Sequence, residues 1–168
     1  KTTFDADVFS SIPRLTAMIK GKKVYDPRDG SQSATVATTH TWSDNPALCI
    51  LDYLTNTTYG RSIPFDDIDL TSFTNEANYC DELIDYLDSS GNAVNQKRYT
   101  CNGVINPDET ALNNIKKLCS SCRAVIIPPG DKYKIVIDKA GTPSFTFNED
   151  NIIGDLVLSG GDLREKKN

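Results

Sequence analysis

The chain has 168 residues, enough for one domain with a buried core, and its 24% charged and 38% hydrophobic residues are typical of a globular protein. The net charge of −5 argues against a nucleic-acid-binding surface, which needs clustered Lys and Arg, so no nucleic-acid partner is expected. The longest apolar run, Ala124–Ile127, is far too short to span a membrane. The sequence begins at Lys1 without an initiator Met, which leads us to expect a fragment of a longer protein.

Residues 1–41 carry little periodic signal and are expected to form a lead-in arm with short strands and a polar loop. Alternation over residues 12–20 predicts one strand, and residues 22–25 predict its return. Residues 26–30 contain Pro and Gly in a turn pattern, and residues 31–41 form a loop or an edge strand. Residues 42–168 are predicted to form the main α+β domain.

A capped helix is predicted directly after Trp42. Ser43 is the expected N-cap, and Asp44 suits the positive end of the helix dipole. Pro46 is tolerated in the first turn, where its missing N–H costs no hydrogen bond. Trp42 is expected to pack over the helix start, and a chain reversal is expected at Gly60. Four apolar residues share one helix face: Ala47, Ile50, Leu51 and Leu54.

A second helix is predicted to begin after Asp69, a good N-cap. Its narrow apolar face consists of Leu70, Phe73, Ala77 and Cys80. Residues 82–87 either prolong this helix or form a strand, and we favour the strand. A turn at residues 89–92 and a returning strand at 97–105 complete the prediction for this segment.

The third predicted helix has Asn106 as N-cap, Pro107 at its first position, and Asp108 and Glu109 in its first turn. At about 100° per residue, one apolar arc comprises Ala111, Leu112, Ile115, Leu118, Cys119 and Cys122. The opposite side comprises Asn113, Asn114, Lys116, Lys117, Ser120 and Ser121.

A hairpin with strands at 123–127 and 132–138 follows, and its second strand alternates apolar and polar residues. Two further short strands are predicted at 145–147 and 155–158. The predicted fold class is therefore α+β, with three helices packed against antiparallel β-hairpins. The residues expected in the structural core are Trp42, Leu51, Leu54, Leu112, Ile115, Cys119 and Cys122.

The Cys119-Ser120-Ser121-Cys122 motif could be half of a zinc site or a redox pair. A zinc site needs a second ligand pair, and the other three cysteines are single in the sequence. A redox pair would sit at a helix N-terminus, whereas this motif ends a helix with both sulfurs in the apolar arc. Core packing, with reduced thiols, is the favoured interpretation, and no metal or other cofactor is expected.

Other candidate chemistry is weak. Cys49 and His40, the single histidine, could form a nucleophile and base, but no third residue is recognisable. The acidic residues Asp66, Asp67 and Asp69, with Asp26 and Asp29, could bind calcium weakly, although the EF-hand spacing is not met. The pairs Asp81-Glu82 and Glu149-Asp150 are expected to be surface charges rather than a glycosidase dyad.

Three stretches carry a family resemblance. Residues 42–63 read WSDNPALCILDYLTNTTYGRSI, residues 98–105 read RYTCNGVI, and residues 21–28 read GKKVYDPR. These stretches closely resemble the central part of the lambda-type tail-tip attachment proteins, the hub proteins at the distal end of long-tailed phages. The resemblance runs from about Ile12 to the end of the chain.

The resemblance implies a non-enzymatic structural piece of a phage or prophage tail-tip hub that closes the tail tube and supports host attachment. It implies a homotrimeric parent with other tail-tip proteins as partners, assembled in the host cytoplasm and located in the virion. The fragment alone is expected to be monomeric. Two alternatives remain open: a cell-wall hydrolase domain used in penetration, and an interaction module of a phage-tail-like secretion system.

Overall fold

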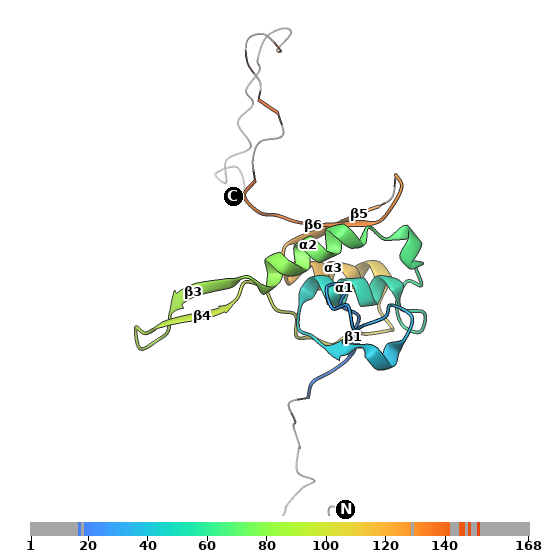
Figure 1. Cartoon of the computed structure of the whole chain (residues 1–168), viewed down its shortest axis with the longest axis horizontal. Helices are drawn as coiled ribbons and strands as arrows, with labels where there is room; N and C mark the ends of the chain where they lie inside the picture. Colours follow the sequence, from blue (N-terminus) through green and yellow to red (C-terminus); the bar gives the residue numbers. More distant parts are fainter. Residues whose placement is uncertain are drawn as a thin grey trace, which may run out of the picture. The chain divides into compact units, whose positions relative to one another are not determined.

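The computed structural model describes residues 17, 19–128, 130–141, 145, 146, 148 and 151. The chain divides into two compact units, Lys1–Asp138 and Lys139–Asn168, and the helices and strands of the described residues lie in the first (Figure 1). In chain order these elements are β1 (Lys23–Val24), η1 (Ala37–Thr39), β2 (Thr41–Trp42), α1 (Pro46–Thr55), η2 (Phe65–Asp67), α2 (Leu70–Asp81), β3 (Leu83–Leu87), β4 (Ala93–Lys97), α3 (Ala111–Ser120), β5 (Ala124–Ile127) and β6 (Lys134–Ile137).

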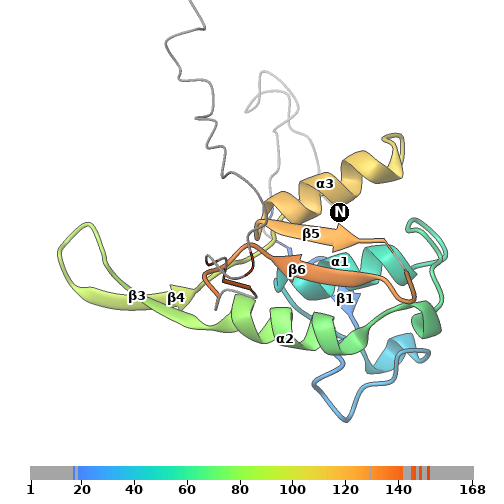
Figure 2. The same ribbon diagram turned by 90° about the horizontal axis from the view of Figure 1, so that it is seen from above.

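The three helices and three antiparallel two-stranded sheets confirm the predicted α+β class. The sheets are β1–β2, β3–β4 and β5–β6. The β5–β6 hairpin lies on one side of the helices (Figures 1 and 2), with α2 along β6 and α3 along β5. The described helices include none that is long and apolar enough to cross a bilayer.

Helix α1 is the centre of the core. The predicted face of Ala47, Ile50, Leu51 and Leu54 is buried, as expected. Leu48 and Tyr53 on other sides of the helix are buried too, because α1 contacts β1, α2 and α3. A short helix that is apolar nearly all round is stable in water only inside such a core.

The start of α1 corrects one prediction: Asn45, not Ser43, is the N-cap. The Asn45 side-chain oxygen accepts hydrogen bonds from the backbone N–H groups of Ala47 and Leu48. Ser43 instead accepts a hydrogen bond from the Asn45 N–H through its hydroxyl. Because Pro46 occupies the first helical position, the residue before it must be the cap, and Asp44 therefore precedes the helix.

The chain reversal expected at Gly60 is confirmed. After α1 ends, the N–H groups of Arg61 and Ile63 return to the carbonyls of Tyr53 and Leu54, at 2.9 Å each. A Cβ on Gly60 would lie 2.1 Å from the Tyr53 carbonyl oxygen. Only glycine lets the backbone approach the helix end this closely.

Helix α2 follows the prediction from cap to face. Asp69 accepts hydrogen bonds from the N–H groups of Thr71 and Ser72, and Phe73, Ala77 and Cys80 are fully buried. The β5–β6 hairpin is also confirmed, with Ala124 opposite Ile137. Strand β6 packs on α2 through its alternating buried residues, Ile135 and Ile137.

Helix α3 begins one turn later than predicted. Thr110 is its N-cap, while Asn106 caps a separate turn by accepting from the N–H of Asp108. The buried residues of α3 are Asn114, Leu118 and Cys119, whereas Leu112, in the first turn of the helix, is 60% exposed. Asn114, predicted on the polar side, is buried because its amide donates to the Asn106 carbonyl at 2.9 Å and to the Tyr53 hydroxyl at 3.3 Å.

The favoured strand at 82–87 is confirmed as β3, which pairs with β4 across a turn at Gly91. The predicted strand at 97–105 is wrong in its position, since β4 ends at Lys97 and residues 98–105 form no regular structure. The hydrogen bond from the Cys101 N–H to the Asp44 carbonyl, 2.7 Å long, instead ties this segment to the start of α1.

In the lead-in segment, β1 pairs with β2 rather than with the strand predicted at 12–20. Most of residues 12–20 lie outside the described residues, as do Phe147 and the strand predicted at 155–158. Phe145 and Thr146 are described and have no strand structure.

Candidate functional site

The residues expected in the structural core take three kinds of position. Leu51, Leu54, Cys119 and Cys122 are buried, and Ile115 is partly buried against the core. Leu112 and Trp42 differ from the expectation. Trp42 lies in β2 rather than over the helix start, and 37% of it is exposed, with Lys20 over its ring.

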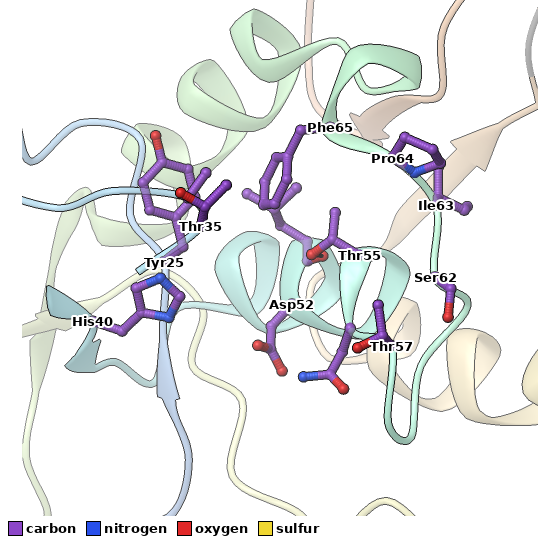
Figure 3. A pocket seen from close by; sticks show the side chains of 13 residues that line it. Tyr25, Thr35, His40, Asp52, Thr55, Thr57, Ser62, Ile63, Pro64 and Phe65 are labelled. Atoms are coloured by element: carbon purple, nitrogen blue, oxygen red, sulfur yellow. Dashed lines mark hydrogen bonds between the residues drawn. The ribbon is translucent and has the colours of Figure 1, made fainter. Parts of the chain in front are cut away.

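The structure does not bring His40 and Cys49 to one site. His40 lines a cavity of about 540 Å³ beside Tyr25, Asp52 and Phe65, shown in Figure 3. Its Nε2 lies 3.0 Å from the Ser33 carbonyl, and its ring centroid lies 5.8 Å from that of Tyr25. Cys49 lines a different cavity, so the structure does not pair the two residues.

Asp52 at the edge of the His40 cavity is also engaged. Its carboxylate accepts a hydrogen bond from the Tyr59 hydroxyl. Burial and this hydrogen bond raise the pKa of Tyr59, which therefore keeps its proton at neutral pH. The arrangement holds the loop after α1 against the helix.

The five cysteines are free thiols, and four of them form two pairs that the sequence did not predict. The Cys49 thiol donates to the Ser43 carbonyl at 3.9 Å, and its interaction with the neighbouring Cys101 thiol raises the pKa of Cys49 and lowers that of Cys101. The Cys122 thiol donates to the Cys119 carbonyl at 3.8 Å, and its interaction with the Cys80 thiol raises the pKa of Cys80 and lowers that of Cys122. Burial raises the pKa of Cys119, the fifth cysteine, to about 11.

The acidic candidates are separated from one another. Asp69 caps α2, Asp26 binds Arg28, and Asp29 accepts from Ser31 and Gln32 within its own turn. Asp66 and Asp67 are exposed in η2. Among the described residues, no group of three or more His, Cys, Asp or Glu side chains is arranged to hold a metal ion.

The acidic pair at Asp81 and Glu82 has structural partners. Glu82 binds Arg98 at 2.8 Å across the base of the β3–β4 hairpin. Asp81 binds the guanidinium of Arg28 at 2.9 Å and the ammonium of Lys97 at 3.0 Å. Glu149 and Asp150 lie outside the described residues.

Asp81 is the centre of a five-residue charge network. Arg28 also binds Asp26 at 2.7 Å, and Lys97 also binds Asp44 at 2.8 Å. The network joins the lead-in turn, the residue before the α1 cap, the end of α2 and the end of β4. It thereby fixes the base of the β3–β4 hairpin on the helices.

Beyond this base, the β3–β4 hairpin is exposed and apolar. In both views it extends away from the helices (Figures 1 and 2). Leu83 and Leu87 on one face are 62% and 70% exposed, and Tyr86 on the other is 44% exposed. Apolar side chains on both faces of a two-stranded hairpin are typical of a surface that is covered by a partner.

A second apolar surface lies beside Trp42. A groove of about 900 Å³ is bounded by β1, the middle of α1, residues 100–107 and the end of α3. Lys20 lies over the Trp42 ring at 5.0 Å, and Lys22 lies over the Tyr59 ring at 5.4 Å. The groove is thus mainly apolar, with Asp52 and Lys117 also in its lining, and is basic at its β1 rim. We refer to it as the Trp42 groove.

Two comparisons show what the chain is similar to. It is 32% identical, over 163 residues and 89% of its length, to a protein named tip attachment protein J of Escherichia phage SECphi27. It is 25% identical, over 171 aligned residues and 95% of its length, to a protein named baseplate hub protein pb3 of Escherichia phage T5. No protein-family model matches the chain.

The chain spans only a small part of both relatives, 13% of the first and 18% of the second. Both alignments cover nearly all of this chain. The similarity therefore concerns one segment of these much longer proteins, and that segment includes the whole helical core described above.

Proposed function

From the premise that the chain belongs, as one segment, to the phage tail-tip attachment proteins, we propose that it is a structural part of a tail-tip hub. The observation that carries the proposal is the match over 89% of the chain to a tip attachment protein, supported by the match to a baseplate hub protein. Both names refer to the same end of a phage tail.

The segment works by holding shape. Its core is built on α1, and buried polar contacts connect the surrounding elements to that helix. The polar residues that could suggest catalysis have structural partners: His40 with the Ser33 carbonyl, Asp52 with Tyr59, and Asp81 with Arg28 and Lys97. These contacts support a scaffold rather than a cell-wall hydrolase.

In the assembled tail, three copies of the parent protein surround the distal end of the tube, close it and support host attachment. Residues 42–168 serve as the hub domain and residues 1–41 as the lead-in arm. The partners are other copies of the parent and neighbouring tail-tip proteins, and assembly takes place in the host cytoplasm before the tail becomes part of the virion.

Gold-labelled antibodies raised against this chain test the location. We expect label at the distal end of negatively stained tails and none along the tube or on the head. An antibody against a capsid protein of the same phage is the control. Label along the tube would refute a tail-tip role. So would the absence of label from particles treated with mild detergent to expose buried epitopes.

Light scattering tests the assembly state. The parent protein is expected to be a trimer, whereas the 168-residue chain alone is expected to be monomeric at micromolar concentration. A stable trimer of the chain alone would place a self-sufficient interface within this segment. A monomeric parent would refute the ring of three copies.

A further inference from the structure

We propose that the β3–β4 hairpin of one copy docks into the Trp42 groove of a second copy of the chain. The proposal deepens the hub function above and rests on it only for the number of copies in the ring. It assigns both sides of a contact between copies to surfaces of the first structural unit.

The β3–β4 hairpin is the element that inserts, because its apolar side chains are left exposed in its own copy. It is tied to the helices at its base, where the Tyr99 N–H donates to the Cys80 carbonyl and Lys97 binds Asp81 and Asp44. Isolated two-stranded hairpins are marginally stable in water. Its exposed residues Leu83, Tyr86 and Leu87 would gain most from burial against an apolar partner.

The Trp42 groove is the acceptor side. Its lining includes Trp42, Tyr59, Val104 and Ile105, and Val104 is 92% exposed. In both views the hairpin points away from α1 and β1, which border the groove (Figures 1 and 2). A hairpin therefore reaches this groove from another copy rather than from its own.

Charge complementarity selects a second copy as the occupant. Residues 83–96 of the hairpin contain Asp85 and Asp88 and no Lys or Arg. The rim of the groove carries Lys20 and Lys22, both exposed and both stacked over aromatic rings of the groove. Opposite charges at the rim of an apolar contact orient the partners and add specificity more than affinity.

The two surfaces are different, so the contact is head-to-tail rather than two-fold symmetric. Such contacts close into rings when the rotation between copies permits it, which fits an assembly around a tube. One hairpin in one groove is a small contact, and the parent would strengthen it by holding copies at high effective concentration. This agrees with a monomeric chain at micromolar concentration.

Photo-crosslinking of the full 168-residue chain at near-millimolar concentration tests the contact. Benzoylphenylalanine at position 87 should crosslink to a second copy, and mass spectrometry should map the site to residues lining the Trp42 groove. The same probe at position 125, an apolar residue with similar exposure on β5, is the control. Crosslinks from position 87 to another surface, to residues 1–16 of the same chain, or at the control level would overturn the proposal.

A charge exchange separates a specific contact from general stickiness. Asp85→Lys alone and Lys22→Glu alone should each lower the intermolecular crosslink several-fold, while circular dichroism and thermal unfolding stay unchanged. Mixing the two variants restores one native hairpin–groove pair and should recover much of the yield. Crosslink yields that neither change lowers, or that mixing does not restore, would contradict the contact. The proposed tail-tip location is tested separately by antibody labelling.

Discussion

The side chain of Asn45 joins α1 to α2: its oxygen caps α1, while its nitrogen donates to the carbonyl of Ala77 at 2.8 Å. Asn45 is completely buried, so neither contact is exchanged for water. One amide thus satisfies the start of the central helix and a backbone carbonyl in the middle of its neighbour.

Asn45→Ala is therefore expected to be far more costly than a surface cap change. It removes the cap, worth about 1 kcal/mol, and leaves the buried Ala77 carbonyl without its side-chain donor, at about 1–3 kcal/mol. Urea unfolding should show a loss of about 2–4 kcal/mol. The control Asn113→Ala, at an exposed position of α3, should stay within about 0.5 kcal/mol. Equal losses in the two variants would show that the Asn45 bridge does not stabilise the core.

Gly60→Ala should destabilise the protein because the added Cβ would meet the Tyr53 carbonyl at 2.1 Å. The loop must shift to relieve this contact, which would lengthen the hydrogen bonds of Arg61 and Ile63 to the end of α1. We expect a loss of more than about 2 kcal/mol in thermal or urea unfolding. Gly30→Ala, which meets no atom within 4 Å, should change the stability little. A neutral Gly60→Ala would mean that the close approach is not needed.

The charge network at Asp81 predicts a pH dependence. Burial alone would raise the pKa of Asp81, but hydrogen bonds from Lys97, Arg28 and Asn45 outweigh it and lower the pKa. A carboxylate with a lowered folded pKa stabilises the fold above its unfolded pKa of about 3.9, and this stability is lost as the pH falls through the folded pKa.

Unfolding measured between neutral pH and pH 2 should therefore show the Asp81 contribution fading below about pH 4. Asp81→Asn should have lower stability at neutral pH and a shallower acid dependence, so that the two curves converge at low pH. The effect should be modest because Asp81 remains partly open to solvent. Parallel curves would exclude a role for Asp81 in the acid response.

The thiol pairs predict an order of alkylation. Cys101 is half-buried and its pKa is lowered by the neighbouring Cys49 thiol, so iodoacetamide should label it first, with a rate midpoint below the usual thiol pKa of about 8.5. Cys49→Ala should move this midpoint upward. Cys119 and Cys122 should be labelled only after unfolding, because they are buried. Rapid labelling of both in the native chain would contradict the packing at the end of α3.

The local features of the fold could be predicted from the sequence. The Asp69 cap, the buried faces of α1 and α2, and the alternation of β6 depend on residues within one or two helical turns or one strand. Such features follow from helix and strand periodicity and from capping chemistry.

The long-range polar contacts could not be predicted. Asn114 looks like a surface residue of an amphipathic helix, and only the fold brings the Tyr53 hydroxyl to its amide. Arg28 lies far before Asp81 in the sequence and Lys97 lies after it. No sequence pattern predicts that both bind this carboxylate. The start of α3 was predicted wrongly for a local reason: Asn106 and Thr110 are both good caps, and each begins a turn.

The same limit applies to the proposed interface. The sequence of the β3–β4 hairpin places apolar residues on both faces. Whether another element of the chain covers these residues can be seen only in the structure, where they are exposed. The Trp42 groove is built from four separate stretches of the chain, so its outline appears only in the folded structure.

The proposed segment acts through its shape and not through a chemical step. Leu51 is buried at the centre of α1, and Leu51→Asp would bury a charge at a cost of more than about 4 kcal/mol, a large part of a typical stability of about 5–15 kcal/mol. A phage carrying this change in the parent protein should produce no tails, or tails that fail to join heads.

Plaque counts of single alanine variants in that phage test whether the segment is a scaffold or performs a chemical step. Alanine at His40, Cys49, Asp66 or Asp67 should leave the counts nearly unchanged, with normal particles in electron micrographs, because no bond-breaking step depends on these side chains. If one of these variants instead produced normal particles that adsorb to the host but fail to infect, that residue would have a chemical or binding role, and the scaffold account would be contradicted.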